Sequence, residues 1–428
     1  MKRPLLERIY LAIIVVIFAG IVIHAPLSVG FGVLFPDAAL LIKSWKELLM
    51  VALIPLAVIL VTRRRLWREL LSDWVFRIIV GYTLLHIILV AVLYQGIVAT
   101  VAGLAIDLRY VLFFGLVYIL VRSVPQYRAL LLKVAAVGAA VVVGFASLQL
   151  FLPADILSSI GYGRDTIAPY LTVDKNPDYV RVNSTLRGPN PLGAYAGIVL
   201  ALLAAVVITK GRQFTRKYAI GLGILALCSA IALWISYSRS ALVAAVVAAG
   251  IVCAATIMRR LSRKTWIILS VIVCALAGGL IAGQNSSFVS NVLLHENPEG
   301  GSVVSSNDDH IDSLETGVER LLRQPIGGGV GSTGSASLHG DSPIIIENQY
   351  LFIAHETGWV GLALFLVLFG LVMVRLWQRR ADWLALGVFA SGIGLALIGL
   401  LLPVWVDDTV AIIWWGLAAI AISKKDNL

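Results

Sequence analysis

Long apolar runs separated by short polar stretches recur along the whole chain. Each run holds about 20 residues, the length that a helix needs to cross the roughly 30 Å hydrocarbon core of a bilayer. The pattern predicts about twelve membrane-spanning helices, over residues 9–24, 46–62, 76–96, 98–121, 129–151, 191–209, 219–235, 240–258, 266–283, 358–376, 383–402 and 409–423. We therefore expect an all-α, polytopic integral membrane protein in which residues 1–428 form a single transmembrane helical domain.

The connections between these runs alternate in charge. One set holds 24 of the 34 Lys and Arg residues but only 5 of the 24 Asp and Glu residues. Connections rich in Lys and Arg stay on the cytoplasmic side of a membrane. This distribution predicts that both termini are cytoplasmic. The net charge of +10 is then a signal of membrane topology and not a patch for nucleic acid.

Two long polar segments fall on the outer side, over residues 152–190 and 284–357. The second is expected to be a folded loop that contains short helices. It includes the glycine-rich run PIGGGVGSTG (325–334), which lacks the GK[ST] ending of a phosphate-binding P-loop. We interpret this run as a turn that lets two backbone segments pack closely. The cysteines, Cys228, Cys253 and Cys274, lie inside apolar runs and are expected to be small core residues.

Two arginines stand at the outer ends of predicted helices. Arg239 lies in WISYSRSALVAAV (234–246), where a charge at the edge of the membrane is costly. Either it extends toward lipid headgroups or it binds an anion. Arg187 precedes Asn190-Pro191, where the asparagine is expected to cap a helix and the proline to occupy its first turn. A helix N-terminus beside a guanidinium favours an anion, so both arginines are candidate phosphate ligands.

A histidine and a glutamate on the outer side are candidates for proton transfer. His339 and Glu347 both lie in the second long loop, shortly before the span at 358–376. An imidazole takes a proton from a hydroxyl near neutral pH, and a carboxylate beside it orients the ring or shares the task. The alternative histidines are His295, His310 and His355.

Other outer charges have structural interpretations. Asp107 and Arg109, early in the fourth span, are expected to pair with each other. The adjacent Asp407 and Asp408, at the start of the last span, are expected to cap that helix rather than to hold a divalent ion.

Arginines, a helix N-terminus and a base on one face suit a lipid diphosphate. Arginine binds phosphate oxygens with two parallel hydrogen bonds, and charge stabilisation favours departure of the diphosphate. A general base activates the attacking hydroxyl. These features predict glycosyl transfer from a lipid diphosphate outside the cytoplasm, with inversion by a single displacement.

Three segments resemble the O-antigen ligase and polymerase family of bacterial inner-membrane proteins. They are RGPNPLGAYAGIVLALL, WISYSRSALVAAVVA, and RLLRQPIGGGVGS followed by IENQYLFIAHETGWVGLALF, within residues 180–376. The resemblance implies a GT-C-like glycosyltransferase fold of about twelve helices with a large periplasmic loop. It also implies an undecaprenyl-diphosphate-linked donor, no nucleotide, no metal and no cofactor. The site would face the periplasm from the inner membrane.

The resemblance assigns roles to particular residues. It implies that Arg187 and Arg239 bind the diphosphate and that a loop histidine activates the acceptor. The family's His-Asn is Glu347-Asn348 in this chain, and the nearest histidine, His339, lies eight residues earlier. Either His339 is the base with Glu347 beside it, or Glu347 is the base. An arginine that the family often carries before the loop's amphipathic helix has no clear counterpart in this chain, and Arg320 and Arg323 are the candidates to replace it.

Three functions remain open at this stage. An O-antigen ligase would transfer the lipid-linked polysaccharide to a sugar hydroxyl of lipid A–core, and we rank it first. An O-antigen polymerase would extend the glycan on its own carrier, and four bases in the first long loop keep this alternative open: Arg164, Lys175, Arg181 and Arg187. A transporter without chemistry would require polar groups throughout the depth of the membrane.

Overall fold

The computed structural model describes residues 4–173, 176–256, 315, 317–340 and 343–423. Some features predicted from the sequence lie outside these residues: the span at 266–283, the first part of the second loop with His295 and His310, Cys274 and Lys175.

The described chain is a bundle of long helices. Nine helical stretches in it are long and apolar enough to cross a membrane, and two further apolar helices are shorter. The long stretches are α1 with α2 (Leu5–Leu34), α4 (Trp45–Arg63), α6 (Trp74–Val92), α7 (Ile97–Ser123), α8 (Tyr127–Gln149), α9 (Pro189–Lys210), α10 (Arg216–Ile235), α11 (Arg239–Thr256) and α15 (Gln349–Gln378). The shorter ones are α16 (Trp383–Ile398) and α17 (Asp408–Ile422). These eleven stretches correspond to eleven of the predicted spans, so the all-α polytopic fold is confirmed.

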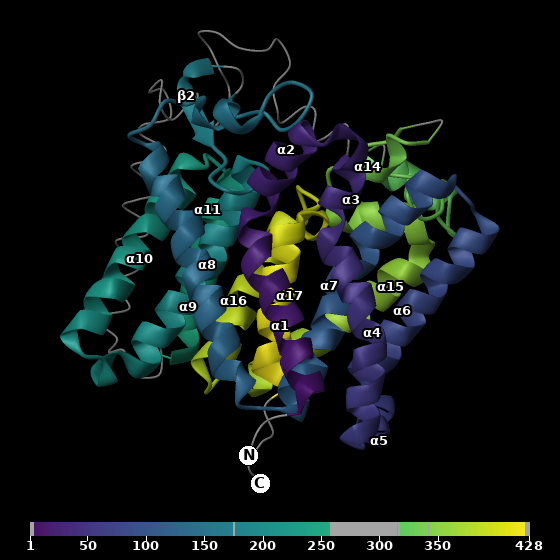
Figure 1. Ribbon diagram of the computed structural model, residues 1–428, viewed down its shortest axis with the longest axis horizontal. Coiled ribbons are helices and arrows are strands. Elements are labelled where there is room, and N and C mark those ends of the chain that lie inside the picture. Colours follow the sequence, from purple (N-terminus) through teal and green to yellow (C-terminus); the bar gives the residue numbers. More distant parts are fainter. Residues whose placement is uncertain (1–3, 174–175, 257–314, 316, 341–342, 424–428) are drawn as a thin grey trace.

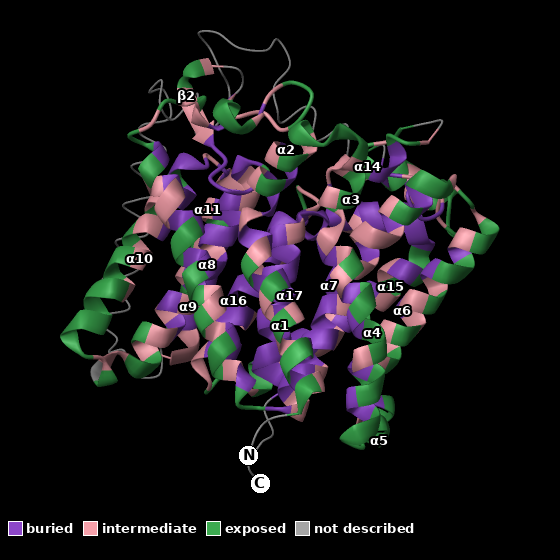
Figure 2. Cartoon of the chain, in the orientation of Figure 1, coloured by how far each residue is buried: buried purple, intermediate pink, exposed green. Residues whose placement is uncertain are grey.

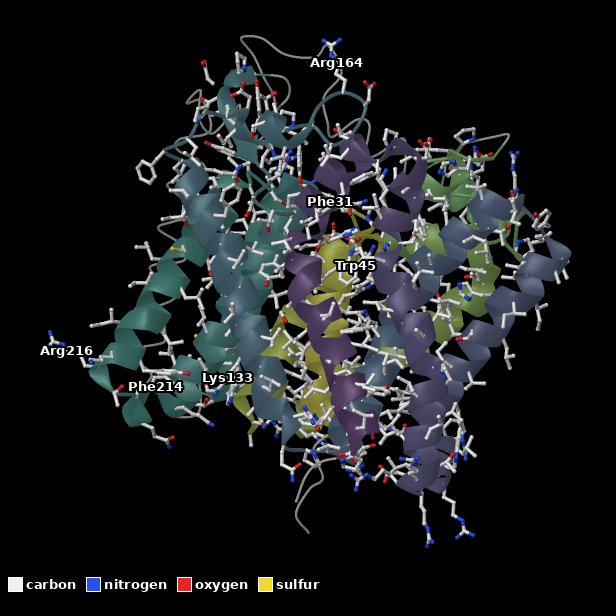
Figure 3. All side chains as sticks on the ribbon, in the orientation of Figure 1. Phe31, Trp45, Lys133, Arg164, Phe214 and Arg216 are labelled. Carbon is white, nitrogen blue, oxygen red and sulfur yellow. The ribbon has the colours of Figure 1, made fainter. Side chains whose placement is uncertain are left out.

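The helices traverse the bundle alternately up and down (Figure 1). The start of α1 and the end of α17 lie at one end, which we call the terminal end. The opposite end, called the loop end, carries α2 (His24–Leu34), the strand β2 (Asn176–Val182) and α14 (Gly334–Ser337). Lys133 and Arg216 lie toward the terminal end and Arg164 at the loop end (Figure 3). This arrangement follows the alternation of charge in the sequence.

Helix α17 forms the centre of the bundle. Every residue from Thr409 to Ile422 is buried, and α7, α16 and α1 pack around the helix (Figures 1 and 2). Gly416 allows this close packing, because a Cβ there would lie 2.8 Å from Phe113 and 2.9 Å from Phe18. The indoles of Trp414 and Trp415 meet edge to face beside it, with centroids 5.2 Å apart. The last helix in the chain is therefore the core around which the earlier ones are arranged.

Small residues bring α9, α11 and α16 together. A Cβ on Gly394 of α16 would lie 2.9 Å from the Ala244 carbonyl of α11, and one on Gly387 would lie 2.8 Å from Leu202 of α9. Apolar surface gains little from leaving lipid, so membrane helices associate by such close packing. These three helices place the N-termini of α9 and α11 side by side at the loop end.

The carboxylates described at the terminal end hold helices together. The ion pairs there are Glu7 with Arg64, Glu69 with Arg122, Asp73 with Arg375, and Asp382 with Arg128. Asp73 binds Arg375 through two bonds of 2.6 and 2.7 Å and also caps α6, while Asp382 caps α16. The few acids of this basic end are thus used for structure.

The structure corrects four details. The first helical stretch continues beyond residue 24 to Leu34. The first long loop contains an antiparallel β-hairpin, β1 (Tyr170–Val173) with β2. Helix α15 begins at Gln349, and the predicted start at residue 358 is a kink where Gly358 has a φ of 66°. Cys253 is exposed on α11, because an apolar membrane helix faces lipid as well as core.

Candidate active site

Arg187 lies directly before α9 at the loop end. The helix begins at Pro189, whose fixed φ suits the first helical position, and Gly188 is the N-cap without a side-chain hydrogen bond. The predicted cap by Asn190 is wrong, because this residue already lies in the first turn. Its side chain instead accepts a 2.6 Å hydrogen bond from Arg181. Arg187 remains where the sequence predicted it, beside a free helix N-terminus.

Arg187 is held by an acid from the far end of the sequence. Its Nε lies 3.1 Å from Oδ2 of Asp407, whose side chain is only 5% exposed, whereas the Arg187 side chain is 45% exposed. Burial raises the pKa of the Asp407 carboxyl, and the Arg187 guanidinium opposes that shift. Asp407 also accepts a hydrogen bond of 2.9 Å from the Val410 N–H, which confirms its predicted role as a helix cap.

Arg239 is the first residue of α11 and is partly buried. The turn before it packs on the first turn of α9, since a Cβ on Gly193 would lie 2.7 Å from Ser236 Oγ and 3.1 Å from Ser238 Cβ. Arg181 ties the two elements together by donating to the Ser236 carbonyl at 2.9 Å. Arg187 and Arg239 therefore both border the N-terminal turn of α9.

The segment around Glu347 packs against the connection that leads to Asp407. The residues after Glu347 are fixed to the connection between α16 and α17: Asn348 donates to the Leu400 carbonyl, and Gln349 accepts from the Trp405 N–H, each at 2.7 Å. Ile346 packs with Val406 in one apolar cluster. The segment that carries Glu347 thus contacts the same connection that holds Arg187 through Asp407.

His339 follows α14 and is exposed. Its backbone N–H donates to the Ala336 carbonyl at 3.1 Å. Within the described residues its imidazole forms no hydrogen bond or ion pair, so it is not brought into contact with either arginine or with Glu347. His355, the alternative histidine, is 4% exposed, and its carbonyl accepts from the Gly328 N–H in the glycine-rich loop. Arg320 is its charged neighbour, whereas Arg323 is exposed and pairs with Glu319.

The glycine-rich run packs backbone against backbone, as predicted. Gly329 and Gly331 have φ angles of 99° and 85°, and a Cβ on them would clash with the carbonyl oxygens of Leu93 and Ala99. The loop thereby lies against the start of α7. Glycine alone meets both demands at once, a left-handed backbone and no side chain.

Replacing Gly331 by alanine is expected to destabilise the protein by more than about 1 kcal/mol, because both the backbone strain and the clash must be relieved. Thermal unfolding in detergent measures the effect. Gly163→Ala is the matched control, since nothing lies within 4 Å of a Cβ at that loop glycine and its φ is not positive. Equal melting temperatures for the two variants would contradict the packing argument.

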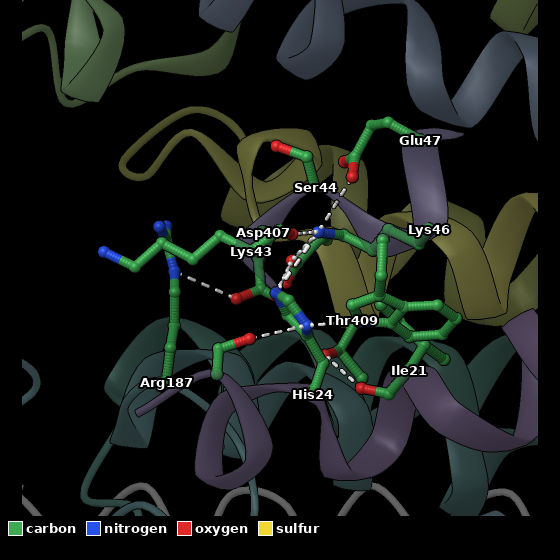
Figure 4. Close-up of polar contacts among 12 residues, drawn as sticks. Ile21, His24, Lys43, Ser44, Lys46, Glu47, Arg187, Asp407 and Thr409 are labelled. Carbon is green, nitrogen blue, oxygen red and sulfur yellow. Dashed lines mark hydrogen bonds and ion pairs between the residues drawn. The ribbon is translucent and has the colours of Figure 1, made fainter. Parts of the chain in front are cut away.

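A buried ionic network underlies the arginine site (Figure 4). Lys46 Nζ, on a side chain 3% exposed, lies 3.1 Å from Asp408, 3.2 Å from Glu47 and 3.2 Å from His24. His24 Nε2 lies 3.0 Å from Asp408. Arg109 lies 3.5 Å from Glu47 and donates to the Val406 carbonyl at 2.7 Å. Because Asp408 follows Asp407 directly, this network anchors the residue that holds Arg187.

The predicted pair of Asp107 with Arg109 is wrong. Residues two apart on a helix point in different directions, so Arg109 faces Glu47 and Asp408 while Asp107 faces His86 on α6. His24, Lys46 and Glu47 were not predicted as site residues. A signal was present, since Lys46 and Glu47 are the first two residues of the predicted span at 46–62, where charge is costly.

The fold and this cluster define a polytopic helical membrane protein with a charged site at its loop end. Residues 224–366 match the model of the O-antigen ligase family. This match agrees with the resemblance found in the sequence, and the matched segment contains Arg239, His339 and Glu347. No curated protein matches the chain.

Proposed function

We propose that the protein is an O-antigen ligase. It transfers polysaccharide from undecaprenyl diphosphate to a sugar hydroxyl of lipid A–core at the periplasmic face of the inner membrane. The observation that carries the proposal is the position of Arg187 and Arg239 at the N-terminal turn of α9. Two guanidinium groups beside a helix N-terminus suit a diphosphate anchored in the same bilayer.

Arg187 is oriented for this task by Asp407. The contact uses Nε, so within the described chain both terminal Nη groups are left for phosphate oxygens. A buried carboxylate that holds Nε also fixes the plane of the guanidinium, which lowers the entropy lost on binding. Arg239 supplies the second guanidinium. Together they stabilise the charge that develops on the departing diphosphate.

The chemistry is a single displacement. The acceptor oxygen forms a bond to the anomeric carbon as the bond from that carbon to the phosphate oxygen breaks. The hydroxyl proton passes to a base, either His339 or Glu347. Undecaprenyl diphosphate leaves with the bonding electron pair, and attack from the opposite face inverts the anomeric centre. The chain's own residues supply each of these roles.

A polymerase remains the alternative with the same donor. Of the bases that keep it open, Arg181 donates to Ser236 and Asn190 and so supports the arginine site structurally. Arg164 is exposed at the loop end (Figure 3). A strain without the protein separates the two functions. Loss of a ligase leaves long glycan on the lipid carrier, whereas loss of a polymerase leaves lipid A–core capped with single repeats.

Purified protein provides the direct test. With lipid-linked glycan and lipid A–core in detergent, without nucleotide or added metal, we expect glycan-bearing lipid A–core as the product. Product that is a longer glycan still attached to undecaprenyl diphosphate would identify a polymerase. Absence of both products, with folded protein shown by its thermal unfolding, would refute the proposed chemistry.

A further inference from the structure

A second buried polar cluster lies between α6, α7 and α15. Asp107 of α7 is 6% exposed, Glu356 of α15 is 1% exposed and His86 of α6 is fully buried. The two carboxyl groups are close enough to influence each other electrostatically, and each has one buried oxygen without a hydrogen-bond partner among the described residues. His86 Nε2 lies 3.5 Å from Asp107 Oδ2. None of these residues belongs to the arginine site.

The atoms that face one another in this cluster lack hydrogen-bond donors. Asp107 Oδ2, Glu356 Oε2 and His86 Nε2 are all buried without a hydrogen-bond partner among the described residues. His86 Nδ1 contacts the Tyr82 carbonyl at 2.8 Å, which requires the ring hydrogen on that nitrogen. A neutral His86 therefore presents a lone pair to Asp107. Three acceptors that meet in this way require at least one additional proton.

No fixed positive charge balances the carboxyls. In the described chain, neither Asp107 nor Glu356 forms an ion pair with Lys or Arg. The other titratable groups that face them are Tyr82 of α6 and Tyr110 of α7, which hydrogen-bond to each other. His355 directly precedes Glu356 on α15. The Arg109 guanidinium interacts electrostatically with the Tyr110 hydroxyl. Two ionised carboxylates in contact in such a site would repel without compensation.

We infer that Asp107 and Glu356 share one proton and that this carboxyl–carboxylate pair fastens the glycine-rich loop to α7. The other Glu356 oxygen, Oε1, accepts the Thr333 N–H at 3.2 Å. Glu356 thus links the loop on one side to Asp107 on the other. Like-charged carboxyls elsewhere share a proton for the same reason.

The pair also has a positioning role, and this part rests on the proposed function. The loop that Glu356 holds leads through Gly334 directly into α14 and His339. Gly334 donates to the Ile344 carbonyl at 2.8 Å, so the loop also aligns the segment that precedes Glu347. The shared proton thereby fixes the part of the chain that carries both candidate bases, without touching substrate.

Infrared spectroscopy of the purified full chain in ²H₂O tests the proton directly. We expect a carbonyl band of a protonated carboxylic acid in the wild type that is lost in both Glu356→Gln and Asp107→Asn. Glu319→Gln, at an exposed carboxylate that pairs with Arg323, is the control and should leave the band unchanged. A band that persists in either pair variant overturns the inference. This readout requires no glycan and is independent of the ligase proposal.

Stability and activity test the role of the pair. An amide mimics the protonated carboxyl and donates to the remaining carboxylate, so each single amide variant should keep its melting temperature and its transfer rate within about twofold. Glu356→Ala removes both the acceptor for the Thr333 N–H and the group that shares a proton with Asp107. This variant should lower the melting temperature by several degrees. If Glu356→Gln instead destabilises as strongly as Glu356→Ala, an amide does not replace the Glu356 carboxyl and the shared proton is refuted.

Discussion

Replacing Arg239 by alanine is expected to reduce glycan transfer to lipid A–core by about 10²–10³-fold, the usual effect of removing one group that stabilises developing negative charge. The same result is expected for Arg187→Ala. Both variants should remain in the membrane in normal amount, because Arg239 is only partly buried and the Arg187 side chain is 45% exposed. Transfer is measured with purified protein, and membrane content by immunoblotting.

Two further variants make the test specific. Arg239→Lys keeps the charge but loses the planar fork, so it should recover only part of the activity. Arg164→Ala removes an exposed arginine from the same end of the molecule and should leave transfer unchanged. Full transfer by Arg239→Ala and Arg187→Ala would exclude these residues from the diphosphate site. An equal loss in the three alanine variants, with full transfer by Arg239→Lys, would indicate an effect of net charge instead.

The membrane spans were predictable because the rules that set them act locally. A run such as 98–121 is apolar over the length of a bilayer, and the structure has Ile97–Ser123 as α7. The alternation of the connections between the two ends of the bundle agrees with the distribution of Lys and Arg in them. The bundle's interior was not predictable in this way. Helix α17 is as apolar as its neighbours, and only packing against α7 and α16 makes it the centre.

Local signals also failed where the backbone departs from its preferred state. The sequence predicts that a span starts at Gly358. In the structure this residue is a kink, and a buried helical segment that begins at Gln349 precedes it. That segment begins with a polar residue, so hydropathy alone does not assign it to the membrane span. The β-hairpin in the first loop was missed because its strands are short, four and seven residues, and lie among polar residues.

In the candidate site, too, local signals could be predicted and contacts between distant parts of the sequence could not. Arg187 was recognisable because a helix start follows it in the sequence. Its partner Asp407 is 220 positions away, and no local pattern connects them. The same holds for His24, Lys46 and Asp408, which come from three separate helical segments. The pairing of Arg109 with Asp107 was predicted from their proximity in the sequence. The helix instead turns the two side chains in different directions.

Replacing Lys46 by methionine is expected to destabilise the protein by about 3–5 kcal/mol, the usual cost of leaving a buried ion without its partner. Lys46 is the cation common to Glu47 and Asp408, and its side chain is 3% exposed. Thermal unfolding in detergent measures the loss. Lys43→Met is the matched control: this lysine is exposed three residues earlier, and its replacement should change stability by no more than about 0.5 kcal/mol.

A second substitution separates charge from shape. In the Lys46→Met background, Asp408→Asn removes one of the uncompensated charges, so the double variant should be more stable than the sum of the two single effects predicts. Additive effects would show that the network of Figure 4 does not act as a unit. Because Asp408 adjoins Asp407, Lys46→Met should also lower transfer through Arg187 in protein that remains folded. Unchanged transfer per folded molecule would separate the network from the arginine site and leave it a purely structural role.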